Sequence, residues 1–588
     1  MNRKGDWSWI AAETAKRGMS ITRVAQYIDI TEQAVRKWIR GQSPPSLEHA
    51  QRLADLFTGG SLDRLIAKTR DSLEHLLDMD MQLKATSPRH ASNVAPQFGD
   101  DDDAVLFEIP LKLLSSGDKR LEGHTANYVV EANRLLIHAR RFRALKAQAK
   151  DVLGKLVGQR TTLSAQMWCD VAYAEVMLGH YPEGAEAAWA AQKADHGRLG
   201  PALLADSEWL MADCLRSMSH LKDAREHGEE SLRLYRKAGV PEYAEGPMWA
   251  EWALSRVDHL EGKLDAALNR CDKVKEVARR GEHRDGVALE IWCRAHIHEM
   301  RGELERSLEL YQEAKQYCRR IDYLYWEAST EWRISEVLRK KGELRGALTL
   351  AEQTTNTFAG LENDDQVSTV WLVTANCYLH QGKYQEATKL FKKIEKHAKL
   401  NQDIWLQERS ALSVQLCHLA FESLKPRPDY RAWLPIAAEQ RPLATASWSL
   451  HTYTMLFQAE ALRLNGHASA ALDQFHALAR RCADSGHQLE QAYALLGAAE
   501  AQRQMGQNDR STVNQALKLF RKMGSSWGQT HALITTALLE TNDSGMSAAY
   551  LNEAYALADK AGFRQESVLI QELQQGIEAR RNHVLLFV

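Results

Sequence analysis

The chain has 588 residues, of which 44% are hydrophobic, and its formal net charge is −2. This length exceeds one ordinary globular core, so we expect several packed units. No stretch approaches the roughly 18 apolar residues of a membrane span, and the N-terminus lacks the apolar core of a signal peptide. The eight cysteines are scattered without a Cys-x-x-Cys pair, which is typical of core residues in a reducing compartment. We therefore expect a cytoplasmic protein with no membrane partner.

The N-terminal end is basic. Residues 1–68 carry eleven Lys or Arg against seven Asp or Glu, which leaves the remainder acidic and suggests a polyanion partner at this end. The sequence predicts a short helix over about Ser20–Ile28, a tight turn at Asp29–Ile30 and a second helix over Glu32–Arg40. Thr31 is expected to cap the second helix.

Apolar and turn residues recur in this domain at spacings that encode a crossing of two helices. These residues are Val24, Ala25, Ile28, Val35, Trp38, Ile39-Arg40-Gly41 and Pro45-Ser46-Leu47. The pattern resembles the helix-turn-helix of the Cro and phage-repressor (XRE-type) class. Asp29 departs from it, because this class usually has glycine in the turn. The alternative is a helical cap that has kept the fold and lost DNA binding.

The resemblance implies that the exposed side of the second helix enters the major groove of double-stranded DNA. It would place on base edges Glu32, Gln33, Arg36 and Lys37. It would place near phosphates Ser20, Arg40, Gln42 and Ser43.

A linker is expected over residues 69–104. Its first part continues a helix with heptad-like apolar spacing, and 85–104 has the composition of a flexible tether that contains the acidic run Asp100–Asp103. The run either solvates the tether or competes with DNA for the basic head.

The rest of the chain repeats one pattern, for which a turn residue serves as the anchor. The anchors are Gly179, Ser219, Gly262, Gly302, Gly342, Gly382, Gly466 and Gly506. They are separated by 40, 43, 40, 40, 40, 84 and 40 residues, and 84 is two periods. Seven positions upstream a small residue is always present: Ala172, Ala212, Ser255, Ala295, Ser335, Ala375, Ala459 and Ala499. A small residue keeps two helices close and glycine permits the reversal between them, so each repeat predicts a helical hairpin.

These hairpins resemble a tetratricopeptide repeat (TPR) array, with longer helices than the usual repeat. The resemblance implies an all-α fold, in which the helix-turn-helix domain is followed by a TPR-like α-solenoid of about eleven hairpins. The last hairpin is expected at Thr530–Ala561, followed by a closing helix at Arg564–Arg581. Prolines should interrupt the array, giving a first segment (105–424), a break (425–443) and a second segment (444–588).

A polar ladder recurs before the anchors, with an acid six residues and a base three residues upstream. The pairs are Asp213–Arg216, Glu336–Arg339, Glu460–Arg463 and Glu500–Arg503; Arg256–His259, His296–Glu299 and Asn376 vary the theme. In TPR proteins these positions face the concave groove. Two interpretations stay open: surface pairs at i,i+3, or residues that read a ligand.

Tryptophans also keep a register, at ten or eleven residues before the anchor. They are Trp168, Trp209, Trp252, Trp292, Trp332 and Trp371. They are either packing residues or an aromatic stripe along the groove. The apolar tail Val584–Val588 either packs on the last hairpin or serves self-association.

The sequence has no phosphate-binding loop and no His-Glu-x-x-His, so we expect no enzyme, cofactor, catalytic residue or metal site. The combination of domains resembles the RNPP group of peptide-sensing bacterial regulators. It implies a homodimeric, sequence-specific transcriptional regulator whose array binds a peptide or protein. The alternative is an interaction scaffold in a phage-defence or toxin-control system, with the helix-turn-helix as an accessory or autoregulatory module.

Overall fold

In a computed structural model, the chain is described over residues 20–28, 30–39, 142–156, 161–194, 199–361, 363–425, 427–433, 447–540 and 544–576, and at isolated positions outside these ranges. It divides into two compact units, Met1–Val171 and Ala172–Val588. The predicted linker, 69–104, lies outside the described residues, and so do Arg40, Gln42 and Ser43.

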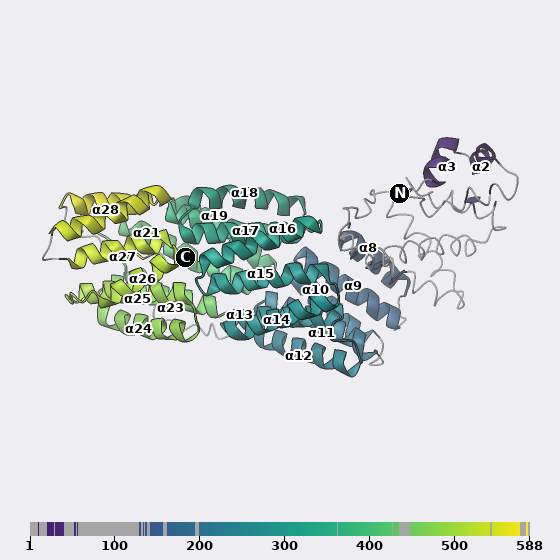
Figure 1. Cartoon of the computed structure of the whole chain (residues 1–588), viewed down its shortest axis with the longest axis horizontal. Helices are drawn as coiled ribbons and strands as arrows, with labels where there is room; N and C mark the ends of the chain where they lie inside the picture. Colours follow the sequence, from purple (N-terminus) through teal and green to yellow (C-terminus); the bar gives the residue numbers. More distant parts are fainter. Residues whose placement is uncertain are drawn as a thin grey trace. The chain divides into compact units, whose positions relative to one another are not determined.

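The N-terminal domain contains the two predicted helices, α2 (Ile21–Ile28) and α3 (Glu32–Ile39), which are labelled in Figure 1. Val24, Ile28 and Val35 are fully buried. The Thr31 hydroxyl accepts a hydrogen bond from the Ala34 amide at 3.3 Å, which confirms the predicted cap. Apolar spacing therefore predicted this pair of helices to within a residue at each end.

From α9 (Thr162–Leu178), which spans the boundary between the two units, the chain forms a TPR-like array of helical hairpins (Figure 1), and the described residues contain no strand. The complete hairpins are α9 (Thr162–Leu178) with α10 (Tyr181–Lys193), α11 (Pro201–Ser217) with α12 (Leu221–Lys237), α13 (Glu245–Leu260) with α14 (Leu264–Arg280), α15 (Arg284–Met300) with α16 (Leu304–Arg320), α17 (Leu324–Lys341) with α18 (Leu344–Gly360), α19 (Asp364–His380) with α20 (Tyr384–Leu400), α23 (Trp448–Leu464) with α24 (Ala468–Asp484), α25 (Gln488–Gln504) with α26 (Ser511–Met523), and α27 (Ser526–Leu539) with α28 (Ser544–Ala561). Helices α8 (Phe142–Lys155) and α21 (Ile404–Ser423) are described without a complete partner helix, and α29 (Arg564–Gln574) follows the last hairpin.

All eight anchors have the left-handed conformation that the turn requires. Their φ angles lie between 66° at Ser219 and 89° at Gly342. The small residues seven positions upstream, from Ala172 to Ala499, are all buried. The hairpin prediction is therefore confirmed at every repeat, including the one in which serine replaces glycine.

The described residues after α21 depart from the hairpin pattern, and residues 434–443 of the predicted break lie outside the described residues. Helix α21 ends at Ser423, and a non-helical stretch leads to the short 3₁₀ turn Arg431–Trp433. The Tyr430 carbonyl accepts a hydrogen bond from the Asn465 side chain at 2.8 Å, so this stretch is tied to α23. Prolines end the helix because they lack the amide hydrogen that the next turn needs.

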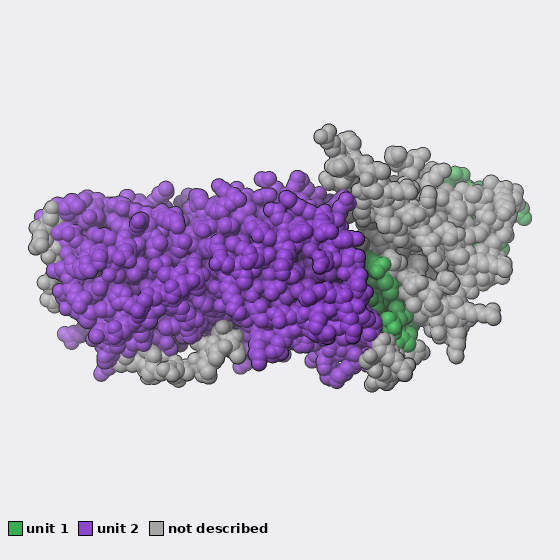
Figure 2. Space-filling view, turned by 60° about the horizontal axis from the view of Figure 1, so that its bottom comes forward, with its two compact units in different colours: residues 1–171 green, residues 172–588 purple. Residues whose placement is uncertain are grey.

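The array also contacts itself across a distance that the repeat pattern did not indicate. The Ser526 hydroxyl, at the start of α27, donates to the Lys341 carbonyl at 2.7 Å, and the Asn363 side chain donates to the Met177 carbonyl at 3.5 Å. A β-carbon on Gly262 would lie 2.4 Å from Trp448. These partners are about 185 residues apart in the chain. Successive turns of the superhelix therefore touch along a line that we call the seam, and Figure 2 shows residues 172–588 as one continuous surface.

The first helix of each hairpin lies inside this arrangement. Helix α13 buries residues around most of its circumference, from Pro247 to His259, whereas α14 buries only a stripe that includes Leu264, Ala267 and Cys271. An outer helix faces solvent on its other side, but an inner helix is covered on one side by its partner and on the other by residues across the inner face. The ladder positions lie on these inner helices.

Candidate functional sites: an exposed helix face and a buried polar ladder

The outward face of α3 carries three exposed polar side chains, Gln33, Arg36 and Lys37. Their i, i+3, i+4 spacing places them on one side of the helix. The opposite side is anchored by Val35 and Trp38, which are buried. The arrangement presents one amide and two cations to solvent on a helix whose other face is fixed.

Glu32 is held within the domain. Its carboxylate accepts hydrogen bonds from the Thr22 hydroxyl at 2.6 Å and from Nε of Arg36 at 2.7 Å. These bonds, Thr22 first and then Arg36, lower the pKa of Glu32. Glu32 therefore ties α2 to α3 and orients Arg36. These bonds leave the Glu32 carboxylate less available to contact a nucleobase.

Ser20 also has a local role, because its hydroxyl accepts from the Arg23 amide at 3.2 Å and caps α2.

In the array, all four ladder pairs form hydrogen-bonded ion pairs within one helix. The closest N–O distances are 2.7 Å for Arg216–Asp213, 2.6 Å for Arg339–Glu336, 2.6 Å for Arg463–Glu460 and 3.0 Å for Arg503–Glu500. Their burial contradicts the interpretation as surface pairs, since only the Arg503 side chain, at 25% exposed, reaches solvent appreciably. The physical reason is that the inner helices are covered on both sides, and at Glu460 Leu585 of the C-terminal segment adds to this cover.

The ladder is most complete in the second segment. Glu460 and Arg463 are fully buried, and Arg463 also lies 3.9 Å from Glu500. Glu500 in turn accepts from the Thr535 hydroxyl at 2.7 Å. Burial alone would lower the pKa of Arg463, but Glu460 and Glu500 outweigh it and raise that pKa. Each buried charge here therefore lies beside a charge of the opposite sign, which compensates it.

Arg256, in the first segment, is not compensated in this way. Its nearest carboxylate is that of Asp213, at 3.8 Å, and Asp213 is already bonded to Arg216. Burial, followed by repulsion from Arg216, lowers the pKa of Arg256 to about 10. His259, which stands where the ladder has its base, packs its ring edge-on against His296 at 4.8 Å, and its Nδ1 has no hydrogen-bond partner among the described residues.

His296 bonds to Glu299 at 3.3 Å, as the ladder predicts. Glu299 also accepts from Lys340 at 2.6 Å and from the Tyr311 hydroxyl at 2.9 Å. Burial, and then the charge of Arg333, lower the pKa of His296 to about 4, so it is neutral near pH 7. Asn376 is buried, and its side-chain oxygen has no hydrogen-bond partner among the described residues.

Around Arg256 lies a group that we call the tryptophan–arginine cluster. It consists of Trp252, Arg256, Trp292, Trp326, Trp332 and Arg333. The Arg256 guanidinium lies 4.7 Å from the centre of the Trp252 ring, and that of Arg333 lies 3.9 Å from the Trp332 ring. The tryptophans are buried, as the packing interpretation expects.

The cluster is rich in unused donors. Within the described part of the chain, no acceptor meets Nε of Arg256 or Arg333, or Nε1 of Trp252, Trp326 or Trp332. A buried donor without a partner costs about 1–3 kcal/mol. Both arginine side chains remain about one-fifth exposed, but the unpaired donor atoms are themselves buried, so a ligand reaches them only in an array shape that exposes them. Its chemistry suits a ligand that brings oxygen acceptors.

Arg333 and Arg409 were not among the sequence candidates. Arg333 directly follows an in-register tryptophan, and a search for bases beside that position would have found it. Arg409 is buried in α21 with its guanidinium 4.2 Å from the Tyr453 ring, and burial lowers its pKa. The repeat of α21 lacks an anchor glycine, so the register of Arg409 could not be assigned from the repeat pattern.

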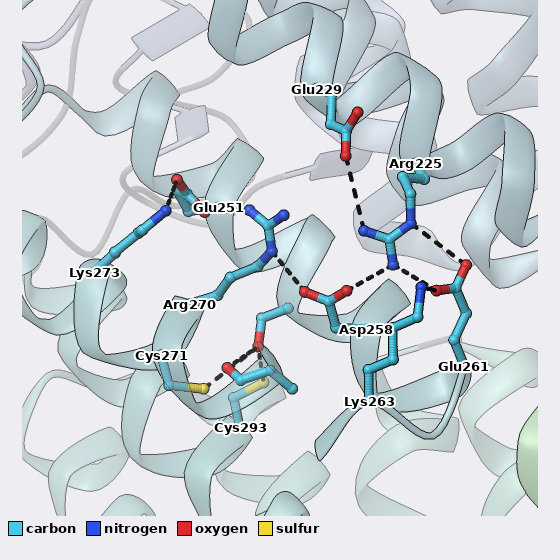
Figure 3. Close-up of polar contacts among 12 residues, drawn as sticks. Arg225, Glu229, Glu251, Asp258, Glu261, Lys263, Arg270, Cys271, Lys273 and Cys293 are labelled. Carbon is cyan, nitrogen blue, oxygen red and sulfur yellow. Dashed lines mark hydrogen bonds and ion pairs between the residues drawn. The ribbon is translucent and has the colours of Figure 1, made fainter. Parts of the chain in front are cut away.

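Another polar network ties α12, α13 and α14 together (Figure 3). Asp258 accepts from Arg225 and from Arg270, each at 2.6 Å, and Arg270 also bonds to Glu251 at 2.7 Å. Because its charges are mutually paired, we assign this network to stability rather than to ligand binding.

One comparison with known proteins agrees with the helix-turn-helix of the N-terminal domain. A family model described as Helix-turn-helix matches residues 11–65, which include α2 and α3. No curated protein matches the chain. The chain is similar to the crystal structure of a Rap protein complexed with competence and sporulation factor, at 12% identity and a TM-score of 0.38 over 54% of this chain and 97% of that one. It is also similar to a signal transduction ATPase with numerous domains (STAND) from Pyrococcus horikoshii that has a tetratricopeptide repeat sensor, at 14% identity and a TM-score of 0.36 over 73% of this chain and 57% of that one.

Both TM-scores are low, and the TPR-like fold stands on the chain's own hairpins. Among the described residues, no helix is both long and apolar enough to cross a membrane.

Proposed function

We propose that the protein is a sequence-specific DNA-binding transcriptional regulator whose array binds a peptide or protein that controls DNA binding. The helix-turn-helix match over 11–65, with Gln33, Arg36 and Lys37 exposed on α3, is the observation that carries the proposal. In a major groove, Gln pairs with adenine, and Arg or Lys pairs with guanine. Glu32 then acts mainly by fixing the direction of Arg36.

We propose that the array partner contacts the inner face. The unpaired donors of the tryptophan–arginine cluster favour a partner that offers carbonyl or carboxylate oxygens. Such a partner would relieve the cost of those donors only in an array shape that exposes them. It would change DNA binding only if it prefers one array shape over another.

We further propose a homodimer. One short recognition helix gives modest affinity, and helix-turn-helix regulators generally place two such helices on half-sites about one DNA turn apart. The array, with its large surface, is the proposed dimerisation element.

Base reading is tested with Arg36→Ala, using Arg23→Ala as a control that removes the same charge from an exposed position on α2. Binding-site selection should yield a preferred sequence for the wild type. Arg36→Ala should cost about 1–3 kcal/mol on that site and relax preference at one base pair. Arg23→Ala should leave the base preference intact. An equal loss on random DNA for Arg36→Ala would show that Arg36 contacts only phosphate.

The alternative, an interaction scaffold with an accessory helix-turn-helix, is favoured by one observation. The ion pair between Glu32 and Arg36 partly neutralises the exposed face of α3. A scaffold of this kind would bind DNA with no sequence preference or would not bind it at all.

A further inference from the structure

The chain's own C-terminal segment reaches the ladder. Leu585 is fully buried, and its backbone amide donates a hydrogen bond at 2.8 Å to Oε1 of Glu460, a residue of α23. Val584 is buried beside it. Helix α23 lies two hairpins before the last one, so the tail is not held by the last hairpin alone, as the sequence had suggested.

Glu460 is suited to receive a peptide backbone. Arg463 donates to both of its carboxylate oxygens, at 2.7 Å and 2.6 Å, which fixes the carboxylate and neutralises its charge. Each carboxylate oxygen can accept two hydrogen bonds, so Oε1 retains capacity for one more donor. The Leu585 amide supplies that donor.

The ladder does not need the tail. Arg339 and Glu336 form the same two-bond pair, at 2.8 Å and 2.6 Å, and there a histidine rather than a backbone amide adjoins the arginine. An ion pair of this kind is therefore complete in itself. The tail residue at Glu460 is an added occupant of the inner face rather than a missing part of the pair.

We infer that the inner face at Glu460 is a binding site for a peptide with an apolar side chain, and that Val584 and Leu585 of the chain's own C-terminal segment occupy it as a tethered competitor. The inference rests on the proposed function only in that the array binds a peptide. A tethered segment has an effective concentration in the millimolar range, so a free peptide must displace it to bind there. Main-chain hydrogen bonding provides affinity, and burial of the apolar side chain provides selectivity.

The test uses a labelled synthetic peptide with the sequence of residues 577–588, IEARRNHVLLFV. Its binding is measured by fluorescence anisotropy to the full-length protein and to a variant that ends at Gly576. We expect saturable binding to the shortened protein and at least about tenfold weaker binding to the full-length protein, whose own tail competes. A peptide with N-methylleucine at the position of Leu585 lacks the donor and should bind the shortened protein at least about tenfold more weakly.

If the shortened protein is unstable, two point variants of the full-length chain test the release of the tail instead. Leu585→Pro removes the amide donor and should release the tail, so the labelled peptide should bind it more tightly than it binds the wild type. Leu585→Ala keeps the donor and should release the tail less. Circular dichroism checks that each variant is folded.

Absence of peptide binding to the folded shortened protein and to Leu585→Pro would overturn the inference, as would equal binding of the N-methylated peptide. The assay contains no DNA, so its failure is distinct from a failure of DNA recognition.

Discussion

The two segments of the array use one hairpin pattern in two different surroundings. In the first segment, a β-carbon on Gly262, Gly302 or Gly342 would meet a residue of the next superhelical turn at less than 3 Å. In the second segment, Gly466 and Gly506 have the same left-handed φ but open space around them. Glycine is required for the turn in both segments, and only in the first is it also required for the seam.

The ladders differ in the same way. In the second segment Glu460, Arg463 and Glu500 are fully buried and compensate one another. In the first segment Arg256 lacks a close carboxylate and adjoins unpaired donors. At the position six residues before the anchor, Glu460 therefore belongs to a compensated ion pair that also accepts a peptide amide, whereas Arg256 adjoins donors that have no acceptor among the described residues.

The largest effect is expected from Arg463→Met. Removing one partner of a buried ion pair typically costs about 3–5 kcal/mol, because the remaining charge stays buried without compensation. Glu460 would keep only the Leu585 amide. Thermal unfolding should show a large drop in melting temperature, whereas the control Arg503→Met, at a partly exposed position, should show a small one. Equal drops in melting temperature for the two variants would mean that burial of an ion pair does not determine how much it contributes to stability.

The next effect is expected from the anchor glycines. Gly466→Ala should cost about 1–2 kcal/mol, because alanine is strained in the left-handed region. Gly262→Ala adds a clash with Trp448, which typically costs about 1–3 kcal/mol more. Denaturant unfolding of the two variants measures the difference. If both variants lose the same free energy of unfolding, Trp448 is not in close steric contact with Gly262.

A smaller effect concerns pH at the seam. Burial, followed by the charge of Asp403, raises the pKa of Asp365 to about 8. Its ordinary value is about 4, so the folded state holds this proton more tightly than the unfolded state does. The stabilisation is complete below about pH 4 and is lost as pH rises through about 8.

The melting temperature of Asp365→Asn should therefore fall less than that of the wild type as the pH rises from about 5 to about 8. Asp265→Asn, at a position on the exposed surface, is the control and should follow the wild type. If Asp365→Asn and the wild type show the same pH dependence, Asp365 is ionised in the fold at neutral pH.

The smallest effect on stability is expected from Arg256→Met. Replacing a poorly compensated buried charge by an apolar side chain of similar length is often neutral, so we expect a change within about 1 kcal/mol. Asp213 would retain Arg216. The same variant should weaken binding of an acceptor-rich peptide to the inner face, which calorimetric titration with such a peptide measures. A loss of stability as large as that of Arg463→Met would place Arg256 among the structural pairs instead.

Much of the fold follows from local patterns. The spacing of glycine and small residues predicted the hairpins, because both residues act within one pair of helices. The seam was not predictable in this way, since Trp448 meets Gly262 only through the pitch of the whole superhelix. For the same reason the ladder was expected on an open groove and is buried. The cluster around Arg256 is distinguished by the lack of a close carboxylate beside that guanidinium. The sequence alone does not show which charges lie near one another in the fold.

The most direct test of the proposed function is a footprint on the DNA that flanks the protein's own gene, comparing the wild type with Arg36→Ala. We expect protection of a short inverted repeat, with its two halves on one face of the duplex, and loss of that protection in the variant. Protection that is indifferent to sequence and unchanged in Arg36→Ala would contradict sequence-specific recognition by α3.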